Sequence, residues 1–449
     1  MLKREISLLQ ASAINMIDMV GIGPFVAMPM VISMMGSNLF LWAWIFGAFT
    51  AFVDGMIWSE LGAAYPLAGG SYNFLKQAYG RKWGSLMSFL FVWQTCIQAP
   101  LVVASGAIGF AQYFNYLVPL KGFVEYFHYR IPLSVIQQKI VSGTVVVLIT
   151  MLLYRNIKTI GKISVFLWLG VIVTMLWIII GGFTHRQVAY TFLPLRAGEL
   201  FTPAFITVLG HASVKTVYSY LGYYNVCHLG SEISQPQKNI PRSIFISIVG
   251  IALLYLCMNV SIVGVIPWQE AKSSTFIVSS FVEKIYGTRA AQVATGLVLW
   301  IAFASLFAVM LGYSRVPYAA AADNNFFPIF ARLHPRKDFP YISLLFMGAF
   351  GFVFSLLFKL SDVISAIIAM RILVQFIAQA IGVVLLRRKH GANQPFRMWL
   401  YPLPVVLSII IWVFLFVATG HFALWGALIA LAGIVVYWVK NWVGKGGVS

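Results

Sequence analysis

Two glycines and a proline interrupt the middle of the first long apolar stretch. Gly21, Gly23 and Pro24 fall within residues 20–25, near the centre of an apolar run that covers 7–35. Glycine permits unusual backbone angles, and proline removes a backbone donor and clashes with a continuing helix. A helix that breaks here offers free N–H groups and the positive end of a helix dipole, which attract an anion such as a carboxylate. The segment therefore predicts an anion-binding break.

One acidic residue lies beside this break. Asp18 precedes Gly21 by three residues, which is close to one helical turn. An acid within an apolar stretch is energetically expensive, so it is a functional candidate by default. Asp18 can hold an amine or a cation, or accept a proton. The alternative is a structural acid that is hydrogen-bonded to a neighbouring helix.

A second, weaker break is predicted in the apolar run 202–230. Gly222 follows Tyr218, Ser219, Tyr220 and Leu221 there. A single glycine does not signal a break by itself, but its place corresponds to that of the first break if the chain contains two repeats of five helices. Paired interruptions in two halves are the best sequence pointer to a binding site at the middle of the membrane.

Other polar residues fall within the apolar runs. Gln94 and Gln98 are one turn apart and share a helix face, so they are candidate substrate contacts, with a helix–helix hydrogen bond as the alternative. Ser305 and Asp54 are expected to serve in helix packing. Lys215 and Arg371 also lie within expected spans, and the sequence assigns no role to them.

The elements that must position these residues are membrane-spanning helices. Of the 449 residues, 60% are apolar and only 10% are charged, whereas a soluble domain is closer to half apolar and a quarter charged. A spanning helix needs about 20 apolar residues. We therefore expect an all-α membrane protein in one domain, 1–449, with twelve transmembrane helices near 7–35, 38–66, 84–118, 133–154, 161–183, 202–230, 241–266, 289–320, 341–359, 362–387, 402–420 and 422–440.

The basic residues indicate an orientation. With both termini in the cytoplasm, 20 of the 31 Lys and Arg residues fall on cytoplasmic segments and 9 on outer segments, and Lys215 and Arg371 make up the rest. Basic residues accumulate on cytoplasmic loops, so this bias supports cytoplasmic termini. It also accounts for most of the net charge of +19 without nucleic acid as a partner.

Four short stretches share a signature. They read GIGPF at 21–25, SELGAAYPLAGGSY at 59–72 with AYG at 78–80, GSEI at 230–233 with PQKNIP at 236–241, and SR at 314–315 with AD at 322–323 and FFP at 326–328. Together they resemble the amino acid–polyamine–organocation superfamily of permeases. The resemblance covers nearly the whole chain, and its second and third stretches are the most specific.

The resemblance implies a leucine-transporter-type fold. In this fold two inverted five-helix repeats, here about 7–183 and 202–387, precede a trailing helical hairpin at about 402–440. It also implies secondary active transport of amino acids or related amines by alternating access.

The resemblance further implies a set of site residues. The substrate carboxylate would lie on the backbone N–H groups of Ile22 and Gly23, with Met19 and Pro24 in the same segment. The amine would lie on the carbonyl groups of Tyr218, Ser219 and Leu221, with Tyr220 covering the site from outside. Gating or structural roles would fall to Gly21, Gly222, Glu60 and Glu232.

Three departures from the superfamily pattern affect this expectation. Pro24 leaves the anion site with one N–H donor fewer, and a Gly-Pro-Phe sequence here also occurs in polyamine-transporting relatives. Leu221 replaces a common glycine and narrows the site. Val171 stands where some bacterial members carry a lysine that fills the sodium position, so a lysine-based proton mechanism does not transfer.

The sequence therefore supports two functions. The first is a permease or exchanger of amino acids, and the alternative is a carrier of polyamines or other cationic amines, motivated by Asp18 and Pro24. A nutrient sensor that binds without transporting is less favoured, because it would typically carry a long soluble tail. No catalytic motif is visible, so we do not expect an enzyme.

The sequence also sets expectations for cofactors and surroundings. We expect no cofactor and no metal. We expect that transport of the substrate is coupled to a proton or to a counter-substrate and that it is independent of sodium. The expected setting is the lipid bilayer of a bacterial inner (cytoplasmic) membrane, with the protein as a monomer.

Overall fold

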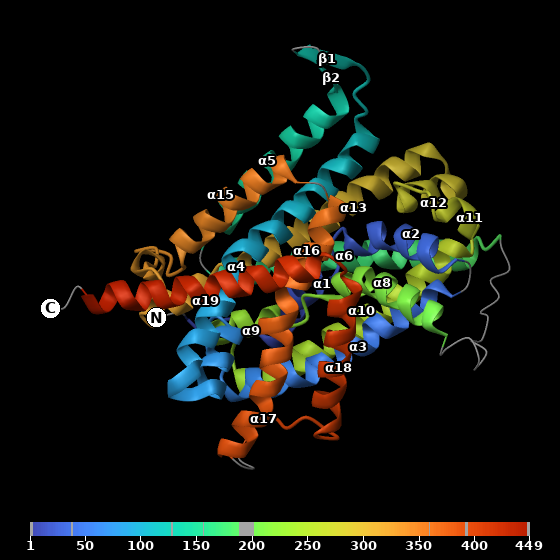
Figure 1. Ribbon diagram of the computed structural model, residues 1–449. Helices are drawn as coiled ribbons and strands as arrows, with labels where there is room; N and C mark the ends of the chain where they lie inside the picture. The colour runs from blue at the N-terminus through green and yellow to red at the C-terminus, as the bar shows by residue number, and fades with distance from the viewer. Residues whose placement is uncertain are drawn as a thin grey trace.

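The computed structural model describes residues 3–36, 39–126, 129–155, 157–187, 202–358, 360–390 and 394–446. Nearly all of this chain is helical (Figure 1). The helices are α1 (Leu8–Met19), α2 (Gly23–Met35), α3 (Phe40–Ala64), α4 (Ser71–Leu117), α5 (Leu133–Leu153), α6 (Ile157–Thr184), α8 (Pro203–Tyr220), α9 (Asn225–His228), α10 (Pro236–Val263), α11 (Trp268–Ala271), α12 (Ile277–Tyr286), α13 (Thr288–Tyr313), α14 (Arg315–Ala322), α15 (Tyr341–Leu357), α16 (Leu360–Arg371), α17 (Ala378–His390), α18 (Leu403–Ala418) and α19 (Phe422–Gly446).

Many of these helices have the length and composition of membrane spans. Within the described residues, eight helices meet that test, or up to nine spans if the bent pair α1 and α2 is counted as one. Two further apolar helices, α15 and α18, are shorter. A multi-pass helical membrane protein is thus confirmed, whereas the expected total of twelve spans exceeds the helices that pass the test.

The most buried spans lie in the interior and the most exposed ones lie at the periphery. The spans formed by α3, α4 and residues 363–389 are mostly buried, whereas α5, α6 and α19 leave most of their apolar surface uncovered. Large apolar side chains such as Phe166, Val173 and Leu424 are more than half exposed on those outer helices. Exposed apolar surface of this extent suits a lipid environment rather than water.

A short hairpin departs from the all-α expectation. Strand β1 (Phe123–Tyr126) pairs antiparallel with β2 (Tyr129–Pro132), with Phe123 opposite Pro132. The hairpin projects beyond the ends of α4 and α5, which it connects (Figure 1). It is confined to one connection and leaves the helical architecture unchanged.

Helix α4 turns sharply near its beginning. Gly80 adopts φ +63°, which separates a short helix at residues 71–79 from the long helix that follows. Only glycine adopts this backbone angle readily. The first part therefore folds back as a separate segment after α3, and the long part crosses the interior.

Both predicted breaks are present in the structure. Helix α1 ends at Met19 and α2 begins at Gly23, with a bend of 42° between the two axes. Helix α8 ends at Tyr220, and α9 begins at Asn225. The start of α1 is fixed by a capping box, in which the Ser7 and Gln10 side chains each bond to the other's backbone N–H.

A buried carboxylate joins three elements of the interior. Asp54 of α3 accepts hydrogen bonds from the Tyr223 hydroxyl at 2.5 Å, from the Trp412 indole N–H at 3.1 Å and from Ser408 at 3.4 Å. All four side chains are buried. Since Tyr223 lies in the second break and Trp412 lies on α18, this carboxylate ties the trailing part of the chain to the broken helix. The packing role expected for Asp54 therefore includes one residue of the break.

We expect Asp54→Ala to destabilise the fold. Its loss leaves the buried donors of Tyr223 and Trp412 without an acceptor, at about 1–3 kcal/mol each. The apparent melting temperature in detergent should fall by about 2–6 °C.

The control for this prediction removes an exposed carboxylate. Glu270 pairs with Lys284 at 3.3 Å on the surface, where an ion pair contributes little. Glu270→Ala should leave the melting temperature nearly unchanged. Equal melting temperatures for the two variants would contradict the role assigned to Asp54.

Candidate functional site

The first break forms where helix α13 approaches the chain. A Cβ atom on Gly21 would lie 2.6 Å from the Ser305 hydroxyl oxygen of α13, so only glycine fits there without a shift. The Ser305 hydroxyl donates to the Asp18 carbonyl oxygen at 3.3 Å. Because the first N–H groups of a helix have no partner within it, the beginning of α2 at Gly23 presents free donors at this point.

The second break touches the first. Gly222 adopts φ +125°, and a Cβ atom there would lie 2.8 Å from the Met19 backbone nitrogen and 2.9 Å from the Asp18 carbonyl carbon. Both neighbours are backbone atoms, which cannot move aside as the end of a side chain can. The backbones of the two interrupted helices are therefore in direct contact at Gly222. The final carbonyl groups of α8 lie beside the end of α1.

A tyrosine of α10 bridges the two breaks. The Tyr255 hydroxyl lies 2.7 Å from the Met19 carbonyl oxygen and 3.1 Å from the Ser219 carbonyl oxygen, and its single O–H is shared between them. Trp44 packs edge-on against the ring of Tyr255 and fixes its position. Sequence reasoning missed Tyr255, because it lies in a helix far along the chain with no local signal.

Asp18 is held by the residue that follows the second break. Its carboxylate accepts a hydrogen bond from the Asn225 side-chain amide at 2.9 Å. The same amide donates to the Ala308 carbonyl oxygen at 2.8 Å, and so connects Asp18 to α13. Asn225 stands directly after the predicted break, which was the only sequence signal for it.

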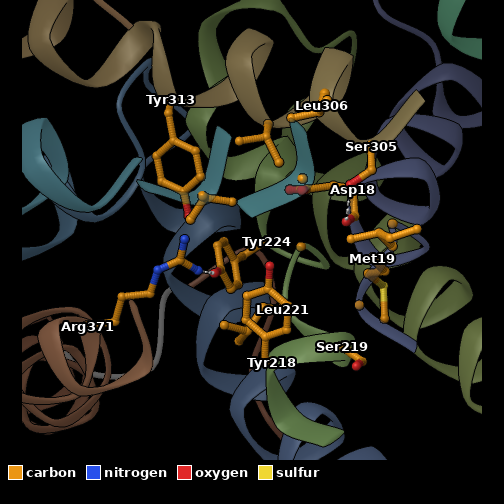
Figure 2. Close-up of a pocket in the computed structure, with 17 residues that line it drawn as sticks. Asp18, Met19, Tyr218, Ser219, Leu221, Tyr224, Ser305, Leu306, Tyr313 and Arg371 are labelled. Atoms are coloured by element: carbon orange, nitrogen blue, oxygen red, sulfur yellow. Dashed lines mark hydrogen bonds between the residues drawn. The ribbon is translucent and has the colours of Figure 1, made fainter. Parts of the chain in front are cut away.

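These elements line a cavity. Its volume is about 50 Å³, counted as the space open to the centre of a water-sized sphere. Figure 2 shows Asp18 on one wall of this cavity and the Arg371 guanidinium on the opposite wall. The lining residues come from both breaks and from α4, α13 and α16: Asp18, Met19, Gly21, Ile22, Gly23, Val102, Gly106, Tyr218, Ser219, Leu221, Gly222, Tyr224, Ser305, Leu306, Val309, Tyr313 and Arg371.

Most residues expected to form the site line this cavity, and four do not. The cavity brings together Asp18, Met19, Gly21, Ile22, Gly23, Tyr218, Ser219, Leu221 and Gly222. Pro24, Tyr220, Gln94 and Gln98 lie outside its lining. Tyr220 points away, with its ring edge-on to Trp44 and Tyr255. The large side chain from this helix that borders the cavity is Tyr218, whose hydroxyl is 2.9 Å from that of Ser105.

Arg371 connects one of the glutamines to the cavity. Its Nε donates to Gln98 Oε1 at 2.6 Å, and its Nη1 donates to the Tyr224 hydroxyl at 2.5 Å. The guanidinium also lies 5.3 Å from the centre of the Tyr313 ring. Gln98 thus supports the cavity wall from behind. The Gln94 amide has no hydrogen-bond partner among the described residues.

Ion pairs close the molecule on one side of the cavity. Glu232, just after α9, makes two 3.0 Å hydrogen bonds to Arg315, and both side chains are buried. Glu60, at the end of α3, makes two 2.6 Å hydrogen bonds to Arg387 of α17. Lys76 pairs with Asp323. The N-terminal segment before α1 joins this side, since the backbone N–H of Ile6 donates to the Glu232 carbonyl oxygen at 2.9 Å.

An apolar plug closes the other side. Ile108, Leu360 and Ile364 form a small buried cluster, against which Val26 and Tyr218 pack. Tyr218 also lines the cavity, whereas Val26, Ile108 and Leu360 line a second, wider cavity beyond the plug. Charge pairs therefore lie toward one side of the central cavity and apolar contacts toward the other.

Comparison with known proteins places the chain among transport proteins. The family model described as amino acid permease matches residues 6–439. The human large neutral amino acids transporter small subunit 2 is 26% identical over 451 residues, which cover 98% of this chain and 80% of the relative. The serine/threonine exchanger SteT of Bacillus subtilis is 24% identical, with 97% of each chain covered. The branched-chain amino acid permease BcaP of Bacillus subtilis is 22% identical, with 98% and 93% covered.

Gly222→Ala should disrupt the meeting of the two breaks. Alanine is strained by about 1–3 kcal/mol at this positive φ, and its Cβ would collide with the backbone at Met19. We expect lower thermal stability and loss of ligand-dependent stabilisation, both measured by melting in detergent. In Gly296→Ala the new methyl group meets open space, so this variant should behave like the wild type. Equal behaviour of the two variants would refute the backbone contact.

Glu232→Gln should loosen the ion-paired side. Removing one charge from a buried pair costs about 3–5 kcal/mol, because Arg315 stays buried without a counter-ion. We expect Cys227, which is buried beside α3, to react faster with a water-soluble maleimide.

The labelling needs a defined background and a control. Cys96 and Cys257 are replaced by serine so that only Cys227 reports. Glu270→Gln, in an exposed ion pair, should leave the labelling rate unchanged. Unchanged Cys227 labelling in Glu232→Gln would show that this ion pair does not hold the closed side.

Proposed function

Because the chain belongs to the amino acid permease family, we propose that it is a secondary transporter of amino acids. The substrate binds in the cavity between the two helix breaks and is released by alternating access. The single observation that carries this proposal is the meeting of two interrupted helices around one shared cavity. Paired interruptions of this kind mark the central site of transporters.

The cavity offers complementary groups for the two charges of an amino acid. The N-terminus of α2 at Gly23, next to Ile22, presents N–H donors and the positive end of a helix dipole to a carboxylate. The C-terminus of α8 presents the carbonyl groups of Tyr218 and Ser219 to an ammonium group. Asp18, on the same wall, adds a negative charge near the ammonium position.

The proposed architecture is the leucine-transporter-type fold with twelve spans. Its support is the pair of breaks at corresponding places, in α1–α2 and in α8–α9. The first repeat then covers about 7–183, the second about 202–387, and the trailing hairpin about 402–440. In this arrangement three further spans are added to the nine that pass the length test among the described residues. One is the broken pair α8 and α9, and the others are the shorter helices α15 and α18.

The ion-paired side is proposed to face the cytoplasm. It contains the N-terminal segment before α1, Glu60 and Glu232, and the basic residues are concentrated on the segments assigned to that side. The wider cavity beyond the apolar plug then opens to the outside. We assign the protein to a bacterial inner membrane, with both termini cytoplasmic, as a monomer.

A polyamine carrier fits the cavity less well. Asp18 would hold one ammonium group of such a substrate, which favours this reading. Arg371, however, places a permanent positive charge on the opposite wall and repels the other end of a polycation. Amino acid transport therefore remains the better proposal.

Coupling is proposed to be independent of sodium. The Ser305 hydroxyl, a candidate sodium ligand, donates its hydrogen bond to the Asp18 carbonyl oxygen. Val171, at the position where some relatives carry a lysine, is buried and apolar. A proton gradient or a counter-substrate then drives the cycle.

Uptake by proteoliposomes tests the function. We expect the purified protein to take up at least one labelled amino acid in exchange for internal amino acids or along a pH gradient, without stimulation by sodium. Gly23→Trp should abolish uptake, because a side chain there enters the cavity, where even a Cβ atom lies 3.2 Å from the Tyr218 ring.

The control and the opposing outcomes are defined by the same assay. Gly296→Ala should transport at the wild-type rate. Wild-type uptake in Gly23→Trp would refute the site, strong stimulation by sodium would refute the coupling, and absence of uptake for a full panel of amino acids would refute the function.

A further inference from the structure

The cavity wall contains a buried guanidinium that amino acid transport as such does not explain. Arg371 is only 2% exposed and lies at the end of α16. A π-helical segment, Ile372–Ile377, follows directly. Single π-helical turns are rare and occur frequently at functional sites. The irregular backbone here sets the direction of Arg371 relative to the rest of the span.

Arg371 has neutral partners. Among the described residues, its hydrogen bonds go to the Gln98 amide oxygen and the Tyr224 hydroxyl, and it lies near the Tyr313 ring. None of the ion pairs among the described residues includes it. Among the described residues, Asp18 is the carboxylate that acts on this cation electrostatically, across the cavity, and a guanidinium stays charged at any physiological pH.

The acid that shares the cavity is engaged elsewhere. Asp18 is held by Asn225 at 2.9 Å and lies on the opposite wall from Arg371 (Figure 2). The two charges are therefore presented separately to whatever occupies the space between them. A ligand can place an ammonium group near Asp18 and an anionic group at Arg371 at the same time.

The route into the cavity is also positively charged. The wider cavity beyond the apolar plug is lined by eighteen described residues, and its charged members are Lys139 and Lys272. A cleft lined by one sign of charge raises the local concentration of oppositely charged solutes. Its charge attracts an anionic substrate, which points in the same direction as Arg371.

We propose that the protein transports amino acids whose side chain ends in a carboxylate, and that Arg371 binds this carboxylate. The inference rests on the proposed transport function and deepens it by naming the substrate class. The substrate's main-chain carboxylate lies at the N-terminus of α2, its ammonium group at the carbonyl groups of α8, and its side chain crosses the cavity to Arg371. A planar guanidinium matches a carboxylate through two parallel hydrogen bonds, which gives strength and selectivity.

The two residues behind Arg371 position it for this role. Gln98 orients the guanidinium through Nε and keeps its own amide nitrogen without a partner among the described residues. Tyr224, in the second break, holds Nη1. Both are neutral, so they fix the geometry of Arg371 and leave its charge available to the substrate.

Substrate competition in proteoliposomes tests the proposal. For the wild-type protein, we expect L-glutamate and L-aspartate to be taken up in preference to L-glutamine, L-asparagine and L-leucine. Arg371→Gln should reduce the preference for glutamate over glutamine by about 10- to 100-fold, as expected for the loss of hydrogen bonds to a charged group. Uptake of neutral amino acids should persist in this variant.

Matched variants separate charge from folding. Arg289→Gln makes the same change at an exposed position and should keep the wild-type selectivity. Arg371→Lys keeps the positive charge but cannot make two parallel hydrogen bonds to a carboxylate. This variant should still select acidic substrates, but with a higher KM for them. If the Arg371 variants do not fold, stabilisation of the wild-type protein against heat by glutamate and not by glutamine supports the proposal, and equal stabilisation opposes it.

The outcomes distinguish this inference from the function on which it rests. Wild-type transport of neutral amino acids without uptake of glutamate or aspartate overturns the inference and leaves the transport function intact. Unchanged selectivity in a folded Arg371→Gln variant also overturns it. Uptake of no amino acid overturns the transport function itself.

Discussion

The close contact between the two chain breaks determines the geometry around it. Gly222 lies against the backbone of Asp18 and Met19, and no side chain fits between them. Each break leaves helix ends with unpaired backbone groups, which membrane proteins tolerate only inside protein or beside a cavity. Two breaks in contact therefore need a shared polar space, and the cavity is that space.

The surrounding polar side chains stabilise this arrangement from three directions. The single O–H of Tyr255 is shared between a carbonyl oxygen from each break, and Asn225 links the Asp18 carboxylate to α13. In the second break, the Tyr223 hydroxyl donates to the Asp54 carboxylate. The same carboxylate accepts from Trp412 and so connects Tyr223 to α18. Each of these groups would be costly if it were buried without a partner, so their hydrogen bonds favour one arrangement of the breaks.

The sequence predicted the backbone features of the site better than its side-chain geometry. Gly21, Gly23 and Pro24 predicted the first break because their effect on a helix is local. Tyr220 was expected to cover the site, yet it faces Trp44, since the direction of a side chain beside a break depends on tertiary packing. Arg371 and Tyr255 carried no local signal for the same reason: their roles arise from helices far apart in the chain. The β1–β2 hairpin was missed because it lies in a short connection.

The two barriers around the cavity rest on different physics, and this difference bears on how they open. When the buried pair of Glu232 and Arg315 separates, water restores much of the solvation that the pair had lost, which offsets the lost attraction. Opening the plug formed by Ile108, Leu360 and Ile364 has no compensating gain in solvation energy, because it exposes apolar surface to water. A substrate that stabilises the cavity with its own charges can shift the balance only through contacts that differ between the two states. Arg371, at the junction of α16 and a π-helical segment and bonded to Tyr224 of the second break, is placed to make such a contact.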